Sequence, residues 1–186
     1  PFDPPRLLVR DLHVDLIPGL PGEDVDTFAA GFDRLVAFNP HQLQFGILKR
    51  LRGAPIERHT RDFDLRFSPD PPYQILSTDR IDFATMQRLG RFARYWDLVA
   101  NSGRFKQTLP LLLGAAPFAR FLAFADWLYQ CTGQTHALAH ERLVNLLHAY
   151  LSQTSDLPGP ISQALIDDYR GAGGRSRTQP RAEGEL

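Results

Sequence analysis

The hydrophobic positions at the start of the chain follow first a strand pattern and then a helix pattern. Residues 12–17 are a largely apolar run closed by prolines and glycines at 18–22, which is typical of a buried parallel strand ending in a turn. Apolar side chains between 28 and 36 then recur at helical spacing before a stop at Asn39-Pro40. Residues 41–48 alternate between apolar and polar side chains, as a second strand would. The pattern predicts one strand–helix–strand unit with parallel strands.

The remaining pattern is mainly helical. Alternating side chains at 63–67 and 73–76 could pair as a short β-hairpin across the proline-rich segment between them. Beyond it, apolar side chains recur at helical spacing in five further segments. These predicted helices begin near Asp82, Phe105, Pro117, Thr135 and Pro160. Asp82 and Thr135 are expected to cap their helices, and Pro110 is expected to limit or kink the second one.

These patterns divide the chain into three parts. We predict a strand–helix–strand fragment at 1–57, a mostly helical domain with a short hairpin at 58–170, and a disordered tail at 171–186. The predicted fold class is α+β and mostly α. Because parallel strands normally belong to larger sheets that are covered by helices, we expect the first part to be the end of a larger α/β structure.

Charge and composition exclude several functional classes. The 21 basic and 21 acidic residues cancel, and no segment concentrates enough lysine and arginine to cover a phosphate backbone, so no nucleic-acid partner is predicted. No apolar run approaches the roughly 20 residues that span a bilayer, and no secretory signal is present, so we predict a cytoplasmic chain without a membrane partner. The single cysteine, Cys131, excludes an internal disulfide and is predicted to be a small apolar helix residue.

Two strand ends and a later block carry a family resemblance. The Gly-Leu-Pro-Gly-Glu turn at 19–23 and the Gly-Ala-Pro loop at 53–55 follow the two predicted strands. Both resemble the fifth and sixth strands of the partial (β/α)6 barrel of the radical SAM superfamily. Residues 71–103 resemble the uncharacterised carboxy-terminal domain that follows the barrel in many cobalamin-binding radical SAM proteins. The resemblance covers about residues 12–113.

The resemblance implies an enzyme larger than this chain. Its parent would cleave S-adenosylmethionine reductively, or pass its methyl group through cobalamin, with a [4Fe-4S] cluster. The family's Cys-x3-Cys-x2-Cys loop and its cobalamin-binding domain both precede the fifth strand, and this chain contains neither. We therefore predict the carboxy-terminal fragment of a cobalamin-dependent radical SAM enzyme, of the Fe–S oxidoreductase or methyltransferase type. The fragment alone would be inactive, would bind no cofactor or metal and would have no catalytic residue; its partners would be the upstream barrel and cobalamin domain of the same polypeptide.

Four residues are assigned to a cofactor site by the same resemblance. Ile17 corresponds to the residue that packs on the adenine of S-adenosylmethionine, and Gly19 would let the backbone approach the cofactor. Leu48 and Lys49 would offer backbone hydrogen bonds to the adenine. The simpler explanation for Ile17 is a core position in the barrel.

Several charged clusters have simpler explanations than binding. Lys49, Arg50 and Arg52 could face an anionic group, or could form a solvated basic loop. A ridge of arginines with a neighbouring tyrosine could hold a phosphate, or could be a solvated helix face. The ridge consists of Arg88, Arg91 and Arg94, with Tyr95 beside them.

Two further candidates are weighed in the same way. His136 and His140 lie four apart on a predicted helix, but no third ligand follows at helical spacing, so no metal site is predicted. Glu23 is expected to be an acid at a helix start rather than a catalytic group.

Two other functional classes stay open. The chain could be a non-catalytic helical interaction or dimerisation module, with its strand–helix–strand part swapped against a second copy. A lone unit of this kind leaves strand edges and an apolar face exposed, which would favour a homodimer. A small α/β enzyme complete in itself is the third class. The substrate is not predicted.

Overall fold

Strand β1 (His13–Leu16), helix α1 (Val25–Ala37) and strand β2 (Gln42–Phe45) form the strand–helix–strand unit that the sequence predicts. The computed structural model describes residues 12–154 and 158–173. The two strands are parallel, with His13 opposite Gln42 and Leu16 opposite Phe45. The first eleven residues and most of the predicted tail, 174–186, lie outside the described residues.

The predicted hairpin is confirmed but is short. Strands β3 (Arg66–Phe67) and β4 (Ile75–Ser77) pair antiparallel, and an isolated bridge between Lys49 and Gln74 joins the hairpin to the segment after β2. Phe63 lies in a turn rather than in a strand, after a 3-10 helix, η1 (Pro55–His59), that the hydrophobic pattern does not indicate.

The helical part confirms most of the predicted helices. It contains α2 (Phe83–Trp96), which continues as a π-helical turn, η2 (Asp97–Asn101), and then α3 (Thr108–Leu113), α4 (Pro117–Thr132), α5 (His140–Thr154) and α6 (Pro158–Gly171). Asp82 caps α2 as predicted, because its carboxylate accepts a hydrogen bond of 2.7 Å from the Thr85 N–H.

Two local predictions are wrong. Thr135 does not cap a helix, since α5 begins only at His140, and α6 begins at Pro158 rather than after Pro160. Pro110 lies in the first turn of α3, where no intrahelical N–H donor is needed, and the helix covers Thr108–Leu113, less than the predicted 105–113.

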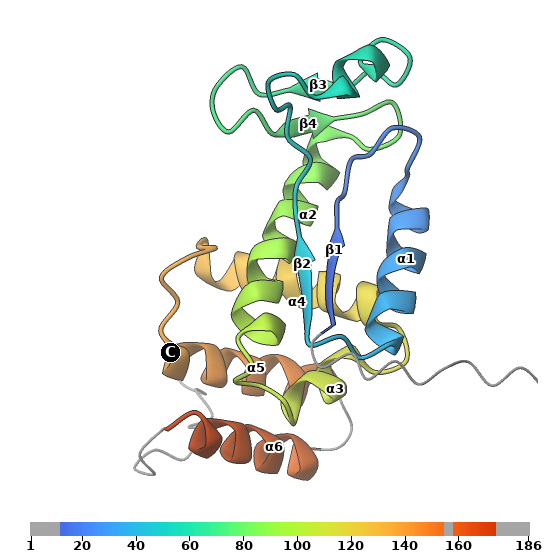
Figure 1. Cartoon of the computed structure of the whole chain (residues 1–186). Coiled ribbons are helices and arrows are strands. Elements are labelled where there is room, and N and C mark those ends of the chain that lie inside the picture. The colour runs from blue at the N-terminus through green and yellow to red at the C-terminus, as the bar shows by residue number, and fades with distance from the viewer. Residues whose placement is uncertain (1–11, 155–157, 174–186) are drawn as a thin grey trace, which may run out of the picture.

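The apolar face of the strand–helix–strand unit is covered by α2 and α4, which lie behind the sheet in Figure 1. Phe32 of α1 contacts Trp96 of α2, with ring centroids 4.9 Å apart. Phe92 of α2 contacts Phe45 of β2 at 5.1 Å and Phe118 of α4 at 5.3 Å. One hydrophobic core therefore runs from the strands into the helical part.

The outer edge of β2 is closed by side chains of α2 and η2. The backbone C=O of Leu43 accepts hydrogen bonds from Trp96 Nε1 at 2.9 Å and from Asn101 Nδ2 at 3.0 Å. The Leu43 N–H donates to Asn101 Oδ1 at 3.3 Å. Asn101 thus pairs with Leu43 as a neighbouring strand residue would, and no strand pairs with this edge in the described chain.

Two helices are capped by residues far away in the sequence. Neither α3 nor α4 has a side-chain cap from its own N-terminal residue. Asp33 of α1 accepts the Phe118 N–H at 2.7 Å, and Asp168 of α6 accepts the N–H groups of Gln107 and Thr108 at 2.9 and 2.8 Å. These carboxylates satisfy the free N–H groups at the two helix starts and fix how the helices pack.

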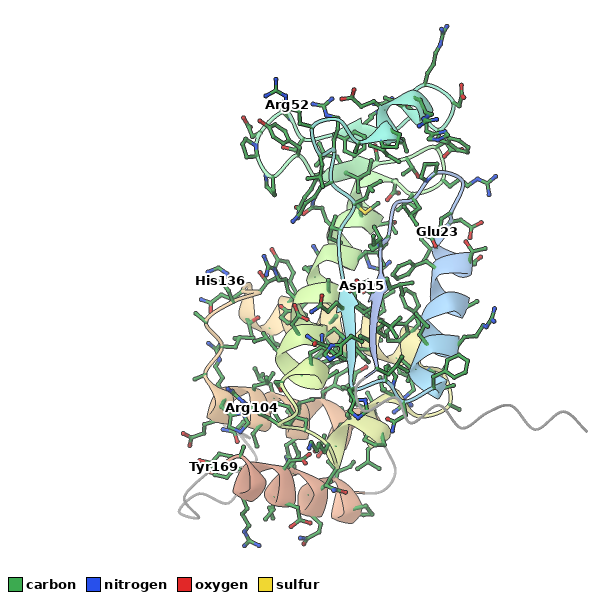
Figure 2. All side chains as sticks on the ribbon, viewed as in Figure 1. Asp15, Glu23, Arg52, Arg104, His136 and Tyr169 are labelled. Atoms are coloured by element: carbon green, nitrogen blue, oxygen red, sulfur yellow. The ribbon has the colours of Figure 1, made fainter. Side chains whose placement is uncertain are left out.

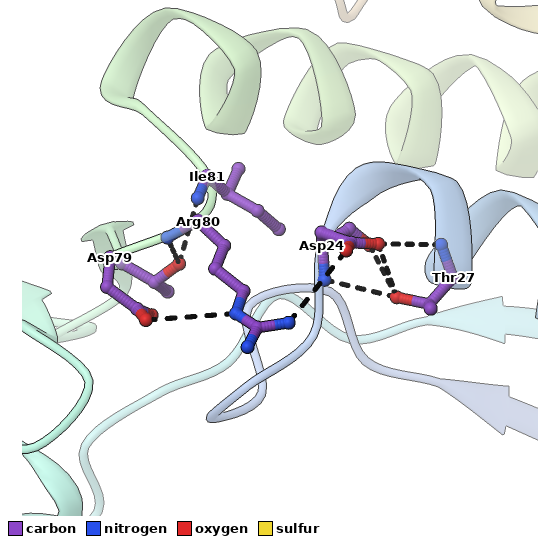
Figure 3. Close-up of polar contacts among 6 residues, drawn as sticks. Asp24, Thr27, Asp79, Arg80 and Ile81 are labelled. Atoms are coloured by element: carbon purple, nitrogen blue, oxygen red, sulfur yellow. Dashed lines mark hydrogen bonds and ion pairs between the residues drawn. The ribbon is translucent and has the colours of Figure 1, made fainter.

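The turn before α2 contacts the start of α1 (Figure 3). The N–H groups of Arg80 and Ile81 donate to Thr78 Oγ1. The Arg80 guanidinium lies 3.9 Å from the carboxylate of Asp24, which caps α1 by accepting the Thr27 N–H at 2.8 Å. The ion pair between Arg80 and Asp24 is exposed and adds little stability. The turn at Thr78 sets the direction in which α2 begins.

Candidate functional site

One face of the β1–β2 sheet is open and polar. Because side chains alternate along a strand, His13 and Asp15 lie on the same face as Gln42 and Gln44, their register partners. His13 Nδ1 and Gln42 Oε1 are 2.8 Å apart, and Asp15, labelled in Figure 2, is exposed. The opposite face carries the apolar side chains that enter the core.

The same face becomes apolar at the carboxyl ends of the strands. Ile17 is 36% exposed. It lies beside Gly46, since a Cβ on Gly46 would come within 3.8 Å of Ile17 Cγ1. Ligands of parallel α/β folds bind at the carboxyl ends of the strands, so Ile17 and Gly46 form an uncovered apolar platform where a ligand is expected.

Gly19 and Leu48 are both engaged within the chain. Gly19 has a φ of +91°, and a Cβ at this position would come within 2.9 Å of Ile75 Cγ2 and 3.0 Å of Met86 Cε. The Leu48 C=O accepts the Ile75 N–H at 2.8 Å, and its N–H lies 3.5 Å from the Pro18 C=O. The turn conformation and the contact with the helical part already account for the glycine.

The backbone groups of Lys49, unlike those of Leu48, are not hydrogen-bonded within the described chain. Its neighbours bond to the hairpin, the Arg50 N–H to Tyr73 and the Leu48 C=O to Ile75, and Lys49 pairs with Gln74 between these two bonds. In such a ladder the N–H and C=O of the middle residue point away from the partner strand. Neither group of Lys49 is bonded to another part of the described chain. Of the two residues predicted to bond an adenine, only Lys49 has both backbone groups free of described partners.

The two arginines of the predicted basic loop differ. Arg50 lies over the ring of Phe67, 5.8 Å from its centroid, and 3.9 Å from the carboxylate of Glu57. Arg52 is exposed in the loop beyond it (Figure 2). Arg50 is therefore held by its own neighbours, and Arg52 is a solvated cation.

A cavity of about 440 Å³ continues the polar face around the outer edge of β2. Gln42 and Gln44 contribute from the strand, and Asp97, Asn101 and Ser102 contribute from η2 and the residue after it. The pattern along the sequence does not reveal this cavity, because η2 reaches β2 only through tertiary packing.

Comparisons with known proteins identify the helical part. Residues 61–178, more than half of the chain, match the family described as "Protein of unknown function (DUF4080)". The chain belongs to this family. No curated protein and no solved structure matches the chain. The match confirms an uncharacterised domain over the hairpin and helices, whereas the radical SAM resemblance stays a prediction.

Within the DUF4080 segment, the predicted arginine ridge is only partly solvated. Arg88 forms an ion pair with Asp126 of α4, in which Nη2 donates to Oδ2 at 2.6 Å and Nε donates to Oδ2 and Oδ1 at 3.1 and 3.3 Å. Arg91 lies over the Tyr129 ring, 4.6 Å from its centroid, and 3.9 Å from Asp126. Arg94 is exposed and pairs with no described side chain. The ridge thus joins α2 to α4 at one end and is open at the other.

The two histidines weighed as metal ligands, His136 and His140, lie apart in the DUF4080 segment. His136 precedes α5, and His140 is the first residue of that helix, so the two rings do not share a helical face. His140 instead stacks on Tyr169, with ring centroids 5.7 Å apart, and lies 5.4 Å from Phe105. No group of three or more possible metal ligands is found within 12–154 and 158–173.

The stability of the DUF4080 segment should depend on the protonation of His140. Both ring nitrogens are buried without a hydrogen bond. Burial, and secondly the nearby Arg104, lowers the pKa of His140 below its usual 6.5. The unfolded chain therefore takes up this proton first as pH falls, so the free energy of unfolding should decrease below pH 6.5 by at most about 1.4 kcal/mol per pH unit.

Denaturant unfolding of the wild type and His140→Phe between pH 5 and pH 8 measures this effect. The phenylalanine variant should lose the decrease below pH 6.5, whereas His136→Phe, which changes an exposed ring, should keep it. Equal pH dependence in the wild type and His140→Phe would contradict the assignment.

Two other residues weighed from the sequence are Glu23 and Cys131. Glu23 lies directly before Asp24, the N-cap of α1, and is therefore an acid at the helix start. Burial, and secondly the charge of Asp24, raises the pKa of Glu23, whose Oε2 is buried without a hydrogen bond beside the start of α1 (Figure 2). Cys131 is exposed on α4, although a small apolar position was predicted. None of the helices in the described part is long and apolar enough to cross a membrane.

Proposed function

We propose that this chain is the carboxy-terminal part of a cobalamin-dependent radical SAM enzyme, in which β1 and β2 are the last two strands of the barrel. The observation that supports it best is a parallel strand pair with one polar, uncovered face and an unpaired outer edge on β1 in the described chain. Parallel sheets are normally covered on both faces, and further strands beside β1 would turn this face towards an enclosed interior.

The residues at the carboxyl end of this face suit the adenine of S-adenosylmethionine. The Ile17 platform offers an apolar surface of the kind on which a flat ring packs, and the free N–H and C=O of Lys49 offer one donor and one acceptor. When bound, S-adenosylmethionine supplies the methyl group or the adenosyl radical of the reaction. The chain's own contribution is to hold the adenine and to exclude water from it.

The residues of this chain do not suit an iron–sulfur cluster. Three thiolates are needed for the family's cluster, and the 186 residues contain one cysteine. Cluster ligation and cobalamin binding are therefore assigned to the upstream part of the same polypeptide. The helical part would brace the last strands, because its core contacts Phe45 and its side chains bond the Leu43 backbone.

Binding of S-adenosylmethionine tests the proposal directly. The isolated chain should show negligible heat in calorimetric titration, whereas a polypeptide extended upstream through the cysteine loop should bind. In the extended protein, Ile17→Ala should weaken binding about tenfold, because burying an isoleucine side chain contributes ~1.5–3 kcal/mol, part of which alanine retains. Phe38→Ala, which removes a 69% exposed side chain at the other end of α1, is the matched control.

Two results would contradict the proposal. One is a tight, stoichiometric complex of S-adenosylmethionine with the isolated chain. The other is an upstream gene sequence without a three-cysteine loop within about 200 residues, the span of a typical barrel.

A non-catalytic dimerisation module is the second candidate, and the unpaired edge of β1 favours it. Two copies could pair through this edge. Sedimentation separates the two candidates: a dimer that persists when the upstream polypeptide is present supports the module, and a dimer that the upstream polypeptide abolishes supports the barrel.

A further inference from the structure

A second cavity, of about 410 Å³, lies between α2, β4 and the end of α4. Its apolar wall is formed by Ile47, Ile75 and Met86, and the last two are buried core residues. Its polar wall includes Arg91 and Arg94. The volume is in the range of small-molecule sites, which commonly combine an apolar lining with a few polar groups.

The cavity carries an excess of positive charge. Among the described residues, two arginines line it and no carboxylate does. Asp126 approaches Arg91 only to 3.9 Å, because its carboxylate is already paired with Arg88 at 2.6 Å, and Arg94 has no ion pair in the described chain. An anion in the cavity would therefore meet two guanidinium groups and no carboxylate of the cavity wall.

The position of the Arg91 side chain is already fixed by its neighbours in the chain. Its guanidinium lies over Tyr129, and its Nε is buried without a hydrogen-bond partner. Fixing a long side chain in advance reduces the entropy that a ligand must remove on binding. The fork of the guanidinium suits the two oxygens of a carboxylate or phosphate.

Two carbonyl groups near the carboxyl end of α4 are already hydrogen-bonded within the chain. Carbonyl groups at a helix end carry negative partial charge, and Gln134 and Thr135 line the cavity just after α4. Two of the carbonyl groups near this end already have donors, since the Gln134 C=O accepts the Tyr95 hydroxyl at 2.7 Å and the Tyr129 C=O accepts the Gly133 N–H at 2.8 Å. They are not left to compete for the arginines.

Gly90 keeps the cavity open. It lies inside α2, one residue before Arg91, and a Cβ added to it would meet nothing within 4 Å. Glycine inside a helix is destabilising relative to alanine, and no packing contact of the described chain requires it here. The glycine is explained if the space above it is occupied by something other than this chain.

We propose that this cavity binds a small organic anion, with its carboxylate or phosphate group between Arg91 and Arg94 and its apolar body against Ile47 and Met86 in the space over Gly90. Its walls come from elements within this chain, so the proposal stands whether or not the barrel assignment is correct.

Two-dimensional NMR titration of the chain with phenyl phosphate and with benzoate tests this site. Both probes carry an oxyanion on an apolar ring, and the tighter of the two identifies the anion that the arginines prefer. We expect saturable shifts at the N–H groups of Gln87, Arg91 and Thr135, and no saturation with benzyl alcohol, which has the ring without the charge.

Three variants localise the binding. Arg94→Gln should weaken it about tenfold, in line with the loss of one charge-assisted hydrogen bond. This side chain is exposed and unpaired, so the variant should fold as the wild type does. Gly90→Leu should abolish binding by filling the space, with its thermal midpoint unchanged or raised. Arg52→Gln, a distant exposed arginine, should change nothing.

The proposal is overturned if benzyl alcohol binds as well as benzoate. It is also overturned if neither anion saturates the chain, or if Arg94→Gln and Gly90→Leu, both folded by circular dichroism, bind as the wild type does.

Discussion

Phe92→Ala is expected to lower the free energy of unfolding by about 3–5 kcal/mol, the usual cost of removing a buried aromatic ring. Phe92 is fully buried, and its ring contacts Phe45 of the strands, Phe118 of α4 and Phe121 at centroid distances of 5.1, 5.3 and 4.8 Å. No neighbour can close the resulting cavity without moving both the strands and α4. Because one core joins the two parts, we expect a single transition in which they unfold together.

Urea denaturation followed by tryptophan fluorescence and by far-ultraviolet circular dichroism measures this loss. Phe92→Leu keeps most of the volume and should cost less than about 1.5 kcal/mol. Phe83→Ala, which removes a 54% exposed ring from the same helix, should change stability by no more than about 0.5 kcal/mol. Separate transitions for the two probes in the wild type would show that the strand–helix–strand unit and the helices are independent.

Asp168→Ala should cost about 2–4 kcal/mol, because it leaves the buried N–H group of Thr108 and the part-buried N–H group of Gln107 without their acceptor. Asp168 is 7% exposed, and its carboxylate accepts the N–H groups of Gln107 and Thr108. These groups lie at the start of α3, so α6 holds that start through a single side chain. Loss of the carboxylate should loosen α3 and α6 together, which hydrogen exchange of their amides would detect.

The neighbouring aspartate is a matched control. Asp167 is exposed and, within the described residues, accepts a hydrogen bond only from Gln163, so Asp167→Ala should change stability by no more than about 0.5 kcal/mol. Asp168→Asn retains one acceptor oxygen but turns an NH₂ group towards the second N–H, and it should cost almost as much as alanine. Equal stability of Asp168→Ala and Asp167→Ala would contradict the assigned role.

Local physics made much of the fold predictable. The alternation in β2, the apolar spacing in α1 and the cap at Asp82 are properties of neighbouring residues, and all three are confirmed. The failures have tertiary causes. Thr135 has the chemistry of a cap, yet the chain between α4 and α5 does not turn into a helix there, and α3 and α4 take their caps from other helices.

The candidate sites were predictable to different degrees. Ile17 and Lys49 are assigned to a cofactor site by the family resemblance alone, and this assignment stays a prediction; Ile17 is 36% exposed, and the Lys49 backbone groups have no partner in the described chain. The arginine-lined cavity could not be predicted, because it gathers residues between 47 and 136 that no sequence spacing relates. The ridge of Arg91 and Arg94 was the only signal, and its meaning depended on Tyr129 and Asp126 of α4.

The closure of β2 at Leu43 makes self-association of this chain directional. A strand from a second copy can reach β1, but pairing along β2 would first have to displace Trp96 and Asn101 from the Leu43 backbone. A fibre that grows by strand pairing needs two unpaired strand edges on every copy. In a sheet with one unpaired edge, two copies pair through that edge and leave none for a third copy. Association through the β1–β2 sheet should therefore end at a closed pair.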